Sequence, residues 1–268
     1  FLTTGITGLE KKFNDVMKGD AGQNVMITNA VGRITGEDKT QYVPPKTGDN
    51  LETTIDDSIQ RTLFDALTAH RAGCGVVLDI KSGDILAMVS TPSFDPNIFR
   101  QDDAEEYING LRQDIAKPFM NKAIEGLYPP GSTFKIVVAL AALEAGAITA
   151  QEQIFCPGHW DYGDRRYHCW EHKGHGKMNL ADALKHSCDI YFYEAAQKLG
   201  INKIADMARE FGLGFKSNVG IENEKSGFIP DTEWKMRKYG ETWQQGESII
   251  SGIGQGYILT TPIQLATM

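Results

Sequence analysis

The feature that most constrains the fold is an unbroken apolar run, residues 136–143, which follows a turn built from two prolines and a glycine. The turn, residues 128–131 (Tyr-Pro-Pro-Gly), cannot continue a helix or a strand, so a new element begins after it. A helix that is apolar on nearly all sides is typically buried. We therefore expect a helix that starts at Ser132, ends at Gly146 and lies at the centre of its domain.

Ser132 and Lys135 bring a hydroxyl and an amine to the first turn of this helix. Residues three apart share a helix face. A serine at a helix N-terminus lies at the positive end of the dipole, which stabilises an alkoxide or a tetrahedral oxyanion. A lysine desolvated against a buried helix can accept the serine proton in its neutral form. The pair predicts an acylation nucleophile with its base; the structural alternative is a serine that only caps the helix.

Composition limits the class of protein. The 268 residues carry a net charge of −8, with 41% hydrophobic and 23% charged residues, as in an ordinary globular protein. The negative charge argues against nucleic acid as a partner. No apolar run approaches the length of a bilayer span. Because the sequence lacks an initiating Met and ends in a helical pattern, we expect a longer protein whose membrane anchor lies outside this chain.

The order of the predicted elements indicates an α+β fold, an antiparallel sheet flanked by helices. Residues 1–50 are expected to form part of a small extended module, with a β-like piece at 24–28. Residues 51–268 are expected to form the main domain. Residues 74–89, around a Ser-Gly turn, predict a β-hairpin. Residues 151–178 are aromatic and rich in Cys and His, and we expect them to be irregular.

A second polar pair lies where two predicted helices meet, with Ser187 and Asp189 on either side of Cys188. A hydroxyl and a carboxylate at such a break can relay a proton and hold a substrate amide. Together with Ser132 and Lys135, this pair resembles the Ser-x-x-Lys and Ser-x-Asn motifs of penicillin-recognising serine enzymes.

The likeness covers nearly the whole chain. Segments that fall in the order seen in class B penicillin-binding proteins are residues 5–10, 51–56, 75–79, 128–135 and 252–256. The sequence is most similar to the elongation-type group, penicillin-binding protein 2, whose second motif usually carries Asp, as here. The resemblance implies a penicillin-binding transpeptidase fold, with residues 1–50 as part of an N-terminal pedestal module.

The resemblance also implies an activity, that of a peptidoglycan D,D-transpeptidase that cross-links cell-wall strands during elongation. Ser132 would attack the penultimate D-Ala carbonyl of a stem peptide, and Lys135 would accept its proton. Ser187 would pass the proton to the leaving amine, and Asp189 would orient Lys135 or the substrate. A β-lactam would trap Ser132 as a long-lived acyl-enzyme, and no organic cofactor is implied.

The implied location is the periplasmic face of the bacterial inner membrane. The implied partners are peptidoglycan stem peptides, β-lactam antibiotics, a membrane-embedded glycan polymerase and other proteins of the elongation machinery.

The third motif of the family, Lys-Thr/Ser-Gly, is expected some tens of residues after the turn at residues 252–256, beyond the end of this sequence. Lys46-Thr47-Gly48 has the same letters but lies upstream of Ser132, after two prolines, so we interpret it as a coincidental turn. We therefore expect a transpeptidase domain truncated before this motif, a piece that can be inactive alone.

Three of the four cysteines and one histidine would supply three thiolates and one imidazole, a tetrahedral zinc set: Cys156, Cys169, His175 and Cys188. Few aliphatic residues hold this segment by packing, and elongation-type relatives place metal-capable side chains in the same loop. We expect a structural zinc ion that positions Ser187. The alternative is a Cys156–Cys169 disulfide in an oxidising periplasm, with Cys188 as a buried thiol.

Two other functions share these residues. A serine β-lactamase or β-lactam sensor uses the same nucleophile, but efficient deacylation needs a water activated by a carboxylate, and such proteins lack a segment like residues 5–10. A non-catalytic, zinc-stabilised scaffold of the elongation machinery would keep its role without Ser132.

Overall fold

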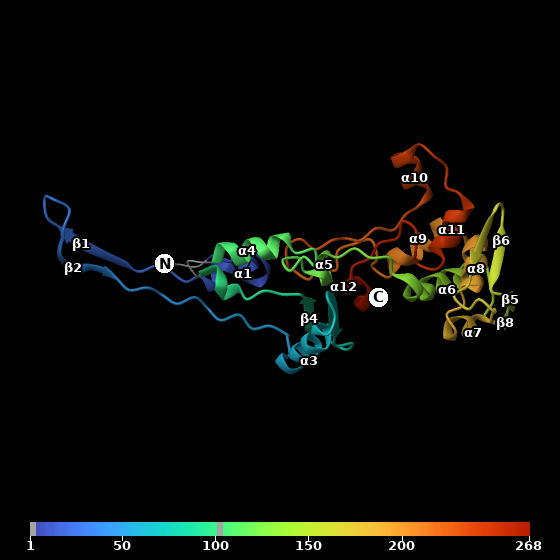
Figure 1. The fold of residues 1–268 in the computed structure, drawn as a ribbon, viewed down its shortest axis with the longest axis horizontal. Helices are drawn as coiled ribbons and strands as arrows, with labels where there is room; N and C mark the ends of the chain where they lie inside the picture. Colours follow the sequence, from blue (N-terminus) through green and yellow to red (C-terminus); the bar gives the residue numbers. More distant parts are fainter. Residues whose placement is uncertain (1–3, 101–103) are drawn as a thin grey trace. The chain divides into compact units, whose positions relative to one another are not determined.

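The computed structural model describes residues 4–100 and 104–268. It divides into two compact units, Phe1–Thr54 with Asn218–Asn223, and Ile55–Ser217 with Glu224–Met268. The elements of the smaller unit (Figure 1) are α1 (Gly8–Lys12), α2 (Asn14–Met17), β1 (Gln23–Thr28) and β2 (Ile34–Val43). The assignment of residues 1–50 to a pedestal module stays a prediction.

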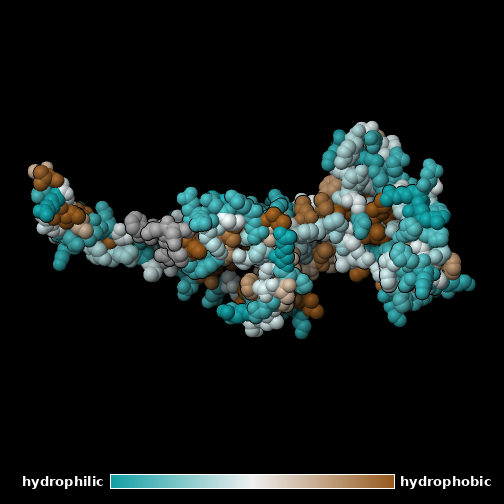
Figure 2. All heavy atoms as spheres, in the orientation of Figure 1, coloured by the Kyte–Doolittle hydropathy of each residue, from teal (hydrophilic) through white to brown (hydrophobic). Residues whose placement is uncertain are grey.

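The smaller unit is built around an exposed hairpin. β1 and β2 pair antiparallel, which confirms the strand expected at residues 24–28. The side chains of both strands are exposed or half-buried, and Figure 2 shows hydrophobic atoms at the tip of the hairpin, where Val31 is 88% exposed. Lys46 also lies in this unit and forms a single antiparallel bridge with Asp20 instead of a strand.

The larger unit combines helices with short antiparallel strand pairs, which confirms the α+β class. Its first elements are α3 (Asp57–Thr68), β3 (Gly73–Leu78), β4 (Ile85–Thr91), η1 (Pro96–Arg100), α4 (Ala104–Gln113) and α5 (Lys122–Glu125). The elements that follow are η2 (Gly131–Phe134), α6 (Lys135–Glu144), β5 (Ile154–Cys156), β6 (His159–Tyr162), β7 (Arg165–His168), β8 (Gly176–Met178), α7 (Leu180–Lys185), α8 (Asp189–Leu199), α9 (Ile201–Glu210), α10 (Thr232–Tyr239), α11 (Gln245–Ser251) and α12 (Pro262–Thr267).

The predicted hairpin is confirmed, because β3 and β4 pair antiparallel around a turn in which Gly83 adopts φ +81°. Asp56 caps α3 by accepting hydrogen bonds from the N–H groups of Ser58 and Ile59. The Gln60 side chain then ties α3 to β4, since its amide oxygen accepts from Met88 N at 2.9 Å and its amide nitrogen donates to Met88 O at 3.2 Å.

Helix α6 packs against α8 and α9 at the centre of the larger unit. Val137, Val138 and Ala142 are fully buried, so the expected burial is confirmed for this face of α6. The expectation is wrong for the other face of α6, whose residues are 37–49% exposed: Ile136, Leu140 and Leu143. Their spacing places them on one side of the helix, and the described residues leave that side exposed.

Residues 151–178 are more regular than expected. β5 pairs with β8, and β6 pairs with β7, both antiparallel. These strands are three or four residues long, too short for a period-of-two pattern to stand out in the sequence. In residues 4–100 and 104–268, no helix has the length and apolar character needed to cross a membrane.

Candidate active site and adjoining thiol–imidazole cluster

The predicted nucleophile lies in a tightly held turn. Ser132 is part of η2, a 3₁₀ turn that runs directly into α6, whose first residue is Lys135. Tyr128 and Thr260 exchange two backbone hydrogen bonds of 2.9 Å just before the turn. Gly131 adopts φ +60° and donates its N–H to the carbonyl oxygen of Gly254 at 3.0 Å. The turn is therefore fixed from both sides by backbone contacts.

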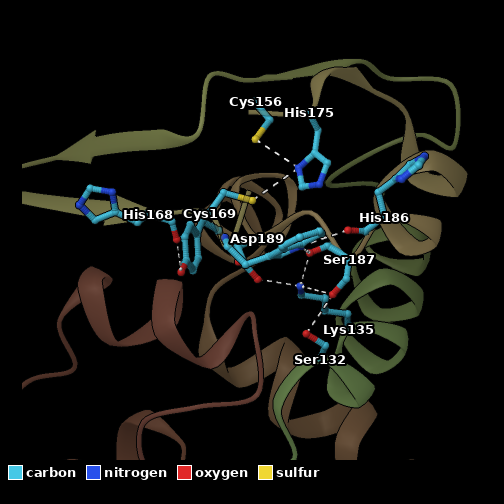
Figure 3. Close-up of polar contacts among 11 residues, drawn as sticks. Ser132, Lys135, Cys156, His168, Cys169, His175, His186, Ser187 and Asp189 are labelled. Atoms are coloured by element: carbon cyan, nitrogen blue, oxygen red, sulfur yellow. Dashed lines mark hydrogen bonds and ion pairs between the residues drawn. The ribbon is translucent and has the colours of Figure 1, made fainter. Parts of the chain in front are cut away.

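Lys135 is the most buried polar group of the site, with only 2% of its side chain exposed. Its ammonium nitrogen donates to Asp189 Oδ1 at 2.7 Å, to Ser187 Oγ at 2.9 Å and to the Ser187 carbonyl oxygen at 2.9 Å (Figure 3). A protonated lysine has three N–H donors, and these three acceptors satisfy all of them. Burial of the ammonium is therefore balanced by one charged partner and two neutral ones.

Ser187 lies between the nucleophile and the lysine. Its hydroxyl is 3.0 Å from Ser132 Oγ and 2.9 Å from Lys135 Nζ. The hydrogen bonds among the described residues thus link Ser132 to Lys135 through Ser187, whereas the sequence interpretation paired Ser132 with Lys135 directly. The structure brings all four predicted catalytic residues together, although Ser132 and Ser187 are 55 positions apart in the chain.

The backbone of Ser187 is unusual. It adopts φ +50°, a left-handed conformation that costs about 1–3 kcal/mol for a residue with a side chain. The residue lies at the break between α7, which ends at Lys185, and α8, which begins at Asp189. Such conformations persist only where the surroundings hold them in place.

A cavity of about 420 Å³ opens beside the two serines. Its lining comes entirely from the larger unit: Gly131, Ser132, Trp170, Ser187, Asp189, Ile253 and Gln255. Two residues of the turn at residues 252–256, Ile253 and Gln255, therefore line the cavity. A second cavity, of about 460 Å³ and bordered by residues of α6 and α9, contains no serine or lysine in its lining and offers no comparable chemistry.

Trp170 is a residue of the site that the sequence interpretation did not single out. It is 59% exposed and lines the cavity. Its position directly after Cys169, a predicted metal ligand, was the available signal.

The four predicted metal ligands also converge. Their ligand atoms all lie within 4.8 Å of one another: Cys156, Cys169, His175 and Cys188. His175 Nδ1 is 3.5 Å from Cys169 Sγ and 3.6 Å from Cys156 Sγ (Figure 3). A tetrahedral zinc ion with Zn–S near 2.3 Å and Zn–N near 2.05 Å requires an N···S separation of about 3.6 Å. The three sulfurs are buried, and no disulfide joins any described cysteine.

The pKa values of two thiols in the cluster are shifted in opposite directions. A hydrogen bond from Cys188 lowers the pKa of Cys169 to about 5 against the effect of burial, and the N–H groups of Glu171 and Asp189 lower it further. The same contact, together with burial, raises the pKa of Cys188. One thiolate is thus already stabilised in the cluster.

The His175 ring presents one nitrogen to the thiols. This nitrogen is Nδ1, whereas Nε2 is buried and has no hydrogen-bond partner among the described residues.

Comparison with known proteins places this geometry in a family. The family model of the penicillin binding protein transpeptidase domain matches residues 73–268, and that of the penicillin-binding protein dimerisation domain matches residues 2–53. The peptidoglycan D,D-transpeptidase MrdA of Escherichia coli K12 is 38% identical over 264 residues, which cover 98% of this chain and 41% of that protein. MrdA of Haemophilus influenzae is 36% identical over 98% of this chain and 40% of its own length.

Solved structures of related proteins are also similar to this chain. PBP2 of Pseudomonas aeruginosa, in complex with WCK 5153, has a TM-score of 0.82 and 36% identity, over 98% of this chain and 55% of that one. PBP2 of Helicobacter pylori, in complex with MreC, has a TM-score of 0.85 and 32% identity, over 98% and 49%. The chain spans less than half the length of the curated relatives, and the expected likeness to penicillin-binding protein 2 is confirmed. Because the transpeptidase family model matches most of this chain, residues 73–268, the chain belongs to the penicillin-binding protein transpeptidase family.

Proposed function

We propose that the protein is a peptidoglycan D,D-transpeptidase that forms a serine acyl-enzyme with D-Ala-D-Ala stem peptides and is acylated by β-lactams at Ser132. The observation that carries the proposal is the hydrogen-bonded path from Ser132 through Ser187 to Lys135, which opens onto the 420 Å³ cavity. The names of the relatives in Escherichia coli and Haemophilus influenzae support the same reaction.

Acylation requires the Ser132 proton to leave as its oxygen attacks. Ser187 Oγ is within hydrogen-bond distance of both Ser132 Oγ and Lys135 Nζ, so its hydroxyl can accept the Ser132 proton while donating its own to neutral Lys135. Ser132 Oγ then bonds to the carbonyl carbon of the penultimate D-Ala. The backbone N–H of Ser132, in the 3₁₀ turn that leads into the N-terminus of α6, is proposed to stabilise the resulting oxyanion.

Collapse of the tetrahedral intermediate breaks the C–N bond, and the leaving D-Ala amine takes the proton back from Lys135 through Ser187. An amine of a second stem peptide next attacks the ester and releases Ser132 with its proton restored. Asp189 Oδ1 lies 2.7 Å from Lys135 Nζ, so Asp189 acts on the lysine side chain and stabilises the ammonium formed when Lys135 takes up the proton.

The cavity favours transfer over β-lactam hydrolysis. Asp189 is the carboxylate in the cavity lining, and its two oxygens are taken up by Lys135 Nζ at 2.7 Å and by the Trp170 N–H at 2.9 Å. A β-lactamase needs a carboxylate that is available to activate water. Slow release of penicillin from the acyl-enzyme is therefore expected, and rapid turnover would support the β-lactamase alternative.

Mass spectrometry of the intact protein tests the proposal. A penicillin should add its mass once, at Ser132, and Ser132→Ala should remain unlabelled while still folding. Labelling of another serine, or no labelling, contradicts the assignment. If Ser132→Ala supports cell elongation as well as the parent does, the protein acts as a scaffold.

We also propose a structural zinc ion held by Cys156, Cys169, His175 and Cys188. The support is the match between the observed N···S distances of 3.5 and 3.6 Å and those of a tetrahedral site. Elemental analysis should give about one zinc per chain, and Cys169→Ser should lose it. Cys74→Ser is the matched control, because Cys74 lies in β3 outside the cluster, and it should keep the metal. Metal-free protein with a Cys156–Cys169 disulfide would overturn the proposal.

The proposed location is the periplasmic face of the inner membrane, where stem peptides are cross-linked. The proposed partners are a membrane-embedded glycan polymerase and other proteins of the elongation machinery. Support comes from solved relatives, namely the Helicobacter pylori PBP2 in complex with MreC and a chain of a peptidoglycan synthase complex that coordinates polymerization and crosslinking, with a TM-score of 0.80 and 31% identity. Affinity purification after crosslinking in cells tests this, and recovery without either kind of partner contradicts it.

A further inference from the structure

Trp170 combines high exposure with an unusual number of polar contacts. It is 59% exposed, yet its indole Nε1 donates to the carbonyl oxygens of Ser187 at 3.0 Å and His186 at 3.2 Å. Its backbone N–H donates to Asp189 Oδ2 at 2.9 Å. An exposed tryptophan whose donors all point into a catalytic motif has a role beyond packing.

Trp170 and Lys135 bind the same two groups. The Ser187 carbonyl oxygen accepts from Lys135 Nζ at 2.9 Å and from the Trp170 indole at 3.0 Å. The Asp189 carboxylate accepts from Lys135 through Oδ1 and from the Trp170 N–H through Oδ2. The tryptophan therefore fixes, from the cavity side, the two acceptors that fix the lysine from the protein interior.

Ser187 needs such support because its φ of +50° is strained. Rotation of its peptide group back toward an ordinary conformation would turn the carbonyl oxygen away from Lys135. The same rotation would carry the Ser187 hydroxyl away from Ser132 Oγ, now 3.0 Å distant. The indole N–H, which donates to the Ser187 carbonyl oxygen at 3.0 Å, opposes this movement.

We propose that Trp170 is a positioning residue for acylation, which holds the Ser187 backbone in its left-handed conformation and the Asp189 carboxylate against Lys135. The proposal rests on the proposed function of Ser132, and it assigns Trp170 no contact with the reacting atoms. The indole N–H carries the effect on Ser187, and the backbone N–H of Trp170 carries the effect on Asp189.

The test is Trp170→Phe in the full-length protein, which removes the indole N–H and keeps both an aromatic ring and the backbone N–H. The rate of acylation by saturating penicillin should fall about five- to tenfold, as expected for one net hydrogen bond. The concentration of penicillin at half-maximal rate should stay the same, because the ring still lines the cavity. Trp160→Phe is the matched control, since Trp160 lies in the same segment as Trp170 but stacks on Tyr162 and on Tyr193 of α8, and it should acylate at the parental rate.

A crystal structure of Trp170→Phe supplies a readout that does not depend on acylation. We expect Ser187 to leave the left-handed region or its hydroxyl to move beyond hydrogen-bond distance of Ser132. Replacement of Trp170 by 3-benzothienylalanine, an isostere without the N–H, should have the same effects. Failure of the parent to label at Ser132 refutes the proposed function, while a displaced Ser187 in the variant would still support the positioning role. An unchanged Ser187 overturns the inference, and so does a parental acylation rate in a protein that labels at Ser132.

Discussion

Replacement of Gly254 by alanine should disturb the nucleophile through the backbone contact between Gly254 and Gly131. A Cβ on Gly254 would lie 2.3 Å from the carbonyl oxygen of Gly131 and 2.7 Å from Phe134 Cβ. Opening the shorter contact to 3.0 Å needs a backbone shift of about 0.7 Å, the difference between the two distances. Gly131 directly precedes Ser132, so the shift reaches the attacking oxygen. A misplacement of about 1 Å can lower a rate about 100-fold, and we expect a decrease of about 50-fold in acylation.

Gly256 provides a matched control in the same turn. Gly254 and Gly256 both have positive φ, +67° and +78°, so alanine at either position costs about 1–2 kcal/mol of backbone strain. The nearest atom to a Cβ on Gly256 is Ile250 Cγ2 at 3.5 Å, an ordinary contact. Gly256→Ala should therefore lose similar stability without moving Gly131, and its acylation rate should stay within about twofold of the parent.

Time courses of labelling by a fluorescent penicillin give the acylation rates of Gly254→Ala and Gly256→Ala, and urea denaturation gives the loss of stability of each variant. The comparison separates the displacement of the nucleophile from general destabilisation. If Gly254→Ala acylates as fast as Gly256→Ala, contact between this turn and Gly131 does not position Ser132, and the reasoning is wrong.

Two further predictions concern ion pairs. Asp189→Asn should lower the free energy of unfolding by about 3–5 kcal/mol, because it leaves the Lys135 ammonium buried without a charged partner. In a Lys135→Met background no ammonium remains, and the same substitution should lower the free energy of unfolding by about 1 kcal/mol or less. Urea midpoints measure both losses, and equal losses in the two backgrounds would show that Asp189 and Lys135 are not coupled. Burial opposes ionisation of Asp231, but the Trp234 N–H and the Arg209 guanidinium outweigh it and lower its pKa below the usual value. Asp231→Asn should therefore be about 1 kcal/mol less stable than the parent at pH 7. This difference in stability should disappear as the pH falls through the lowered pKa of Asp231, below about 4, because the parent then loses its ionised carboxylate. Thermal unfolding measures the difference, and a difference that persists at pH 3 would argue against the ion pair as its source.

Local chemistry made part of the structure predictable. The turn before Ser132 follows from two prolines and a glycine, and the hairpin of β3 and β4 follows from apolar runs on either side of a turn at Gly83. The break that separates Ser187 from α8 was also visible, because a polar pair interrupts an apolar helical pattern. In each case the signal and the structure lie within a few residues of each other.

Contacts between distant segments could not be predicted from local sequence signals. Spacing places Ser132 and Lys135 on one helix face, but it does not say where the lysine nitrogen points. The structure directs it to Ser187 and Asp189, 52 and 54 positions away, so that the path from Ser132 passes through the second hydroxyl. The likeness to a family supplied this pairing of motifs. The contacts of Trp170 could not be read from the sequence, because its indole donates to backbone carbonyl oxygens and its own backbone N–H donates to Asp189, and neither backbone group leaves a trace in the residue types.

The break between α7 and α8 explains why the thiol–imidazole cluster and the catalytic residues occur together. Three consecutive residues leave it in different directions, because Ser187 has φ +50° whereas Cys188 is extended, with φ −69° and ψ 113°. Ser187 and Asp189 thus meet Lys135, and Cys188 between them faces Cys169. Movement of the Cys188 backbone is transmitted through one peptide unit on each side to the residues that carry the hydroxyl and the carboxylate. Ligation of this sulfur would therefore fix the geometry of proton transfer, even though no ligand of the cluster touches Ser132.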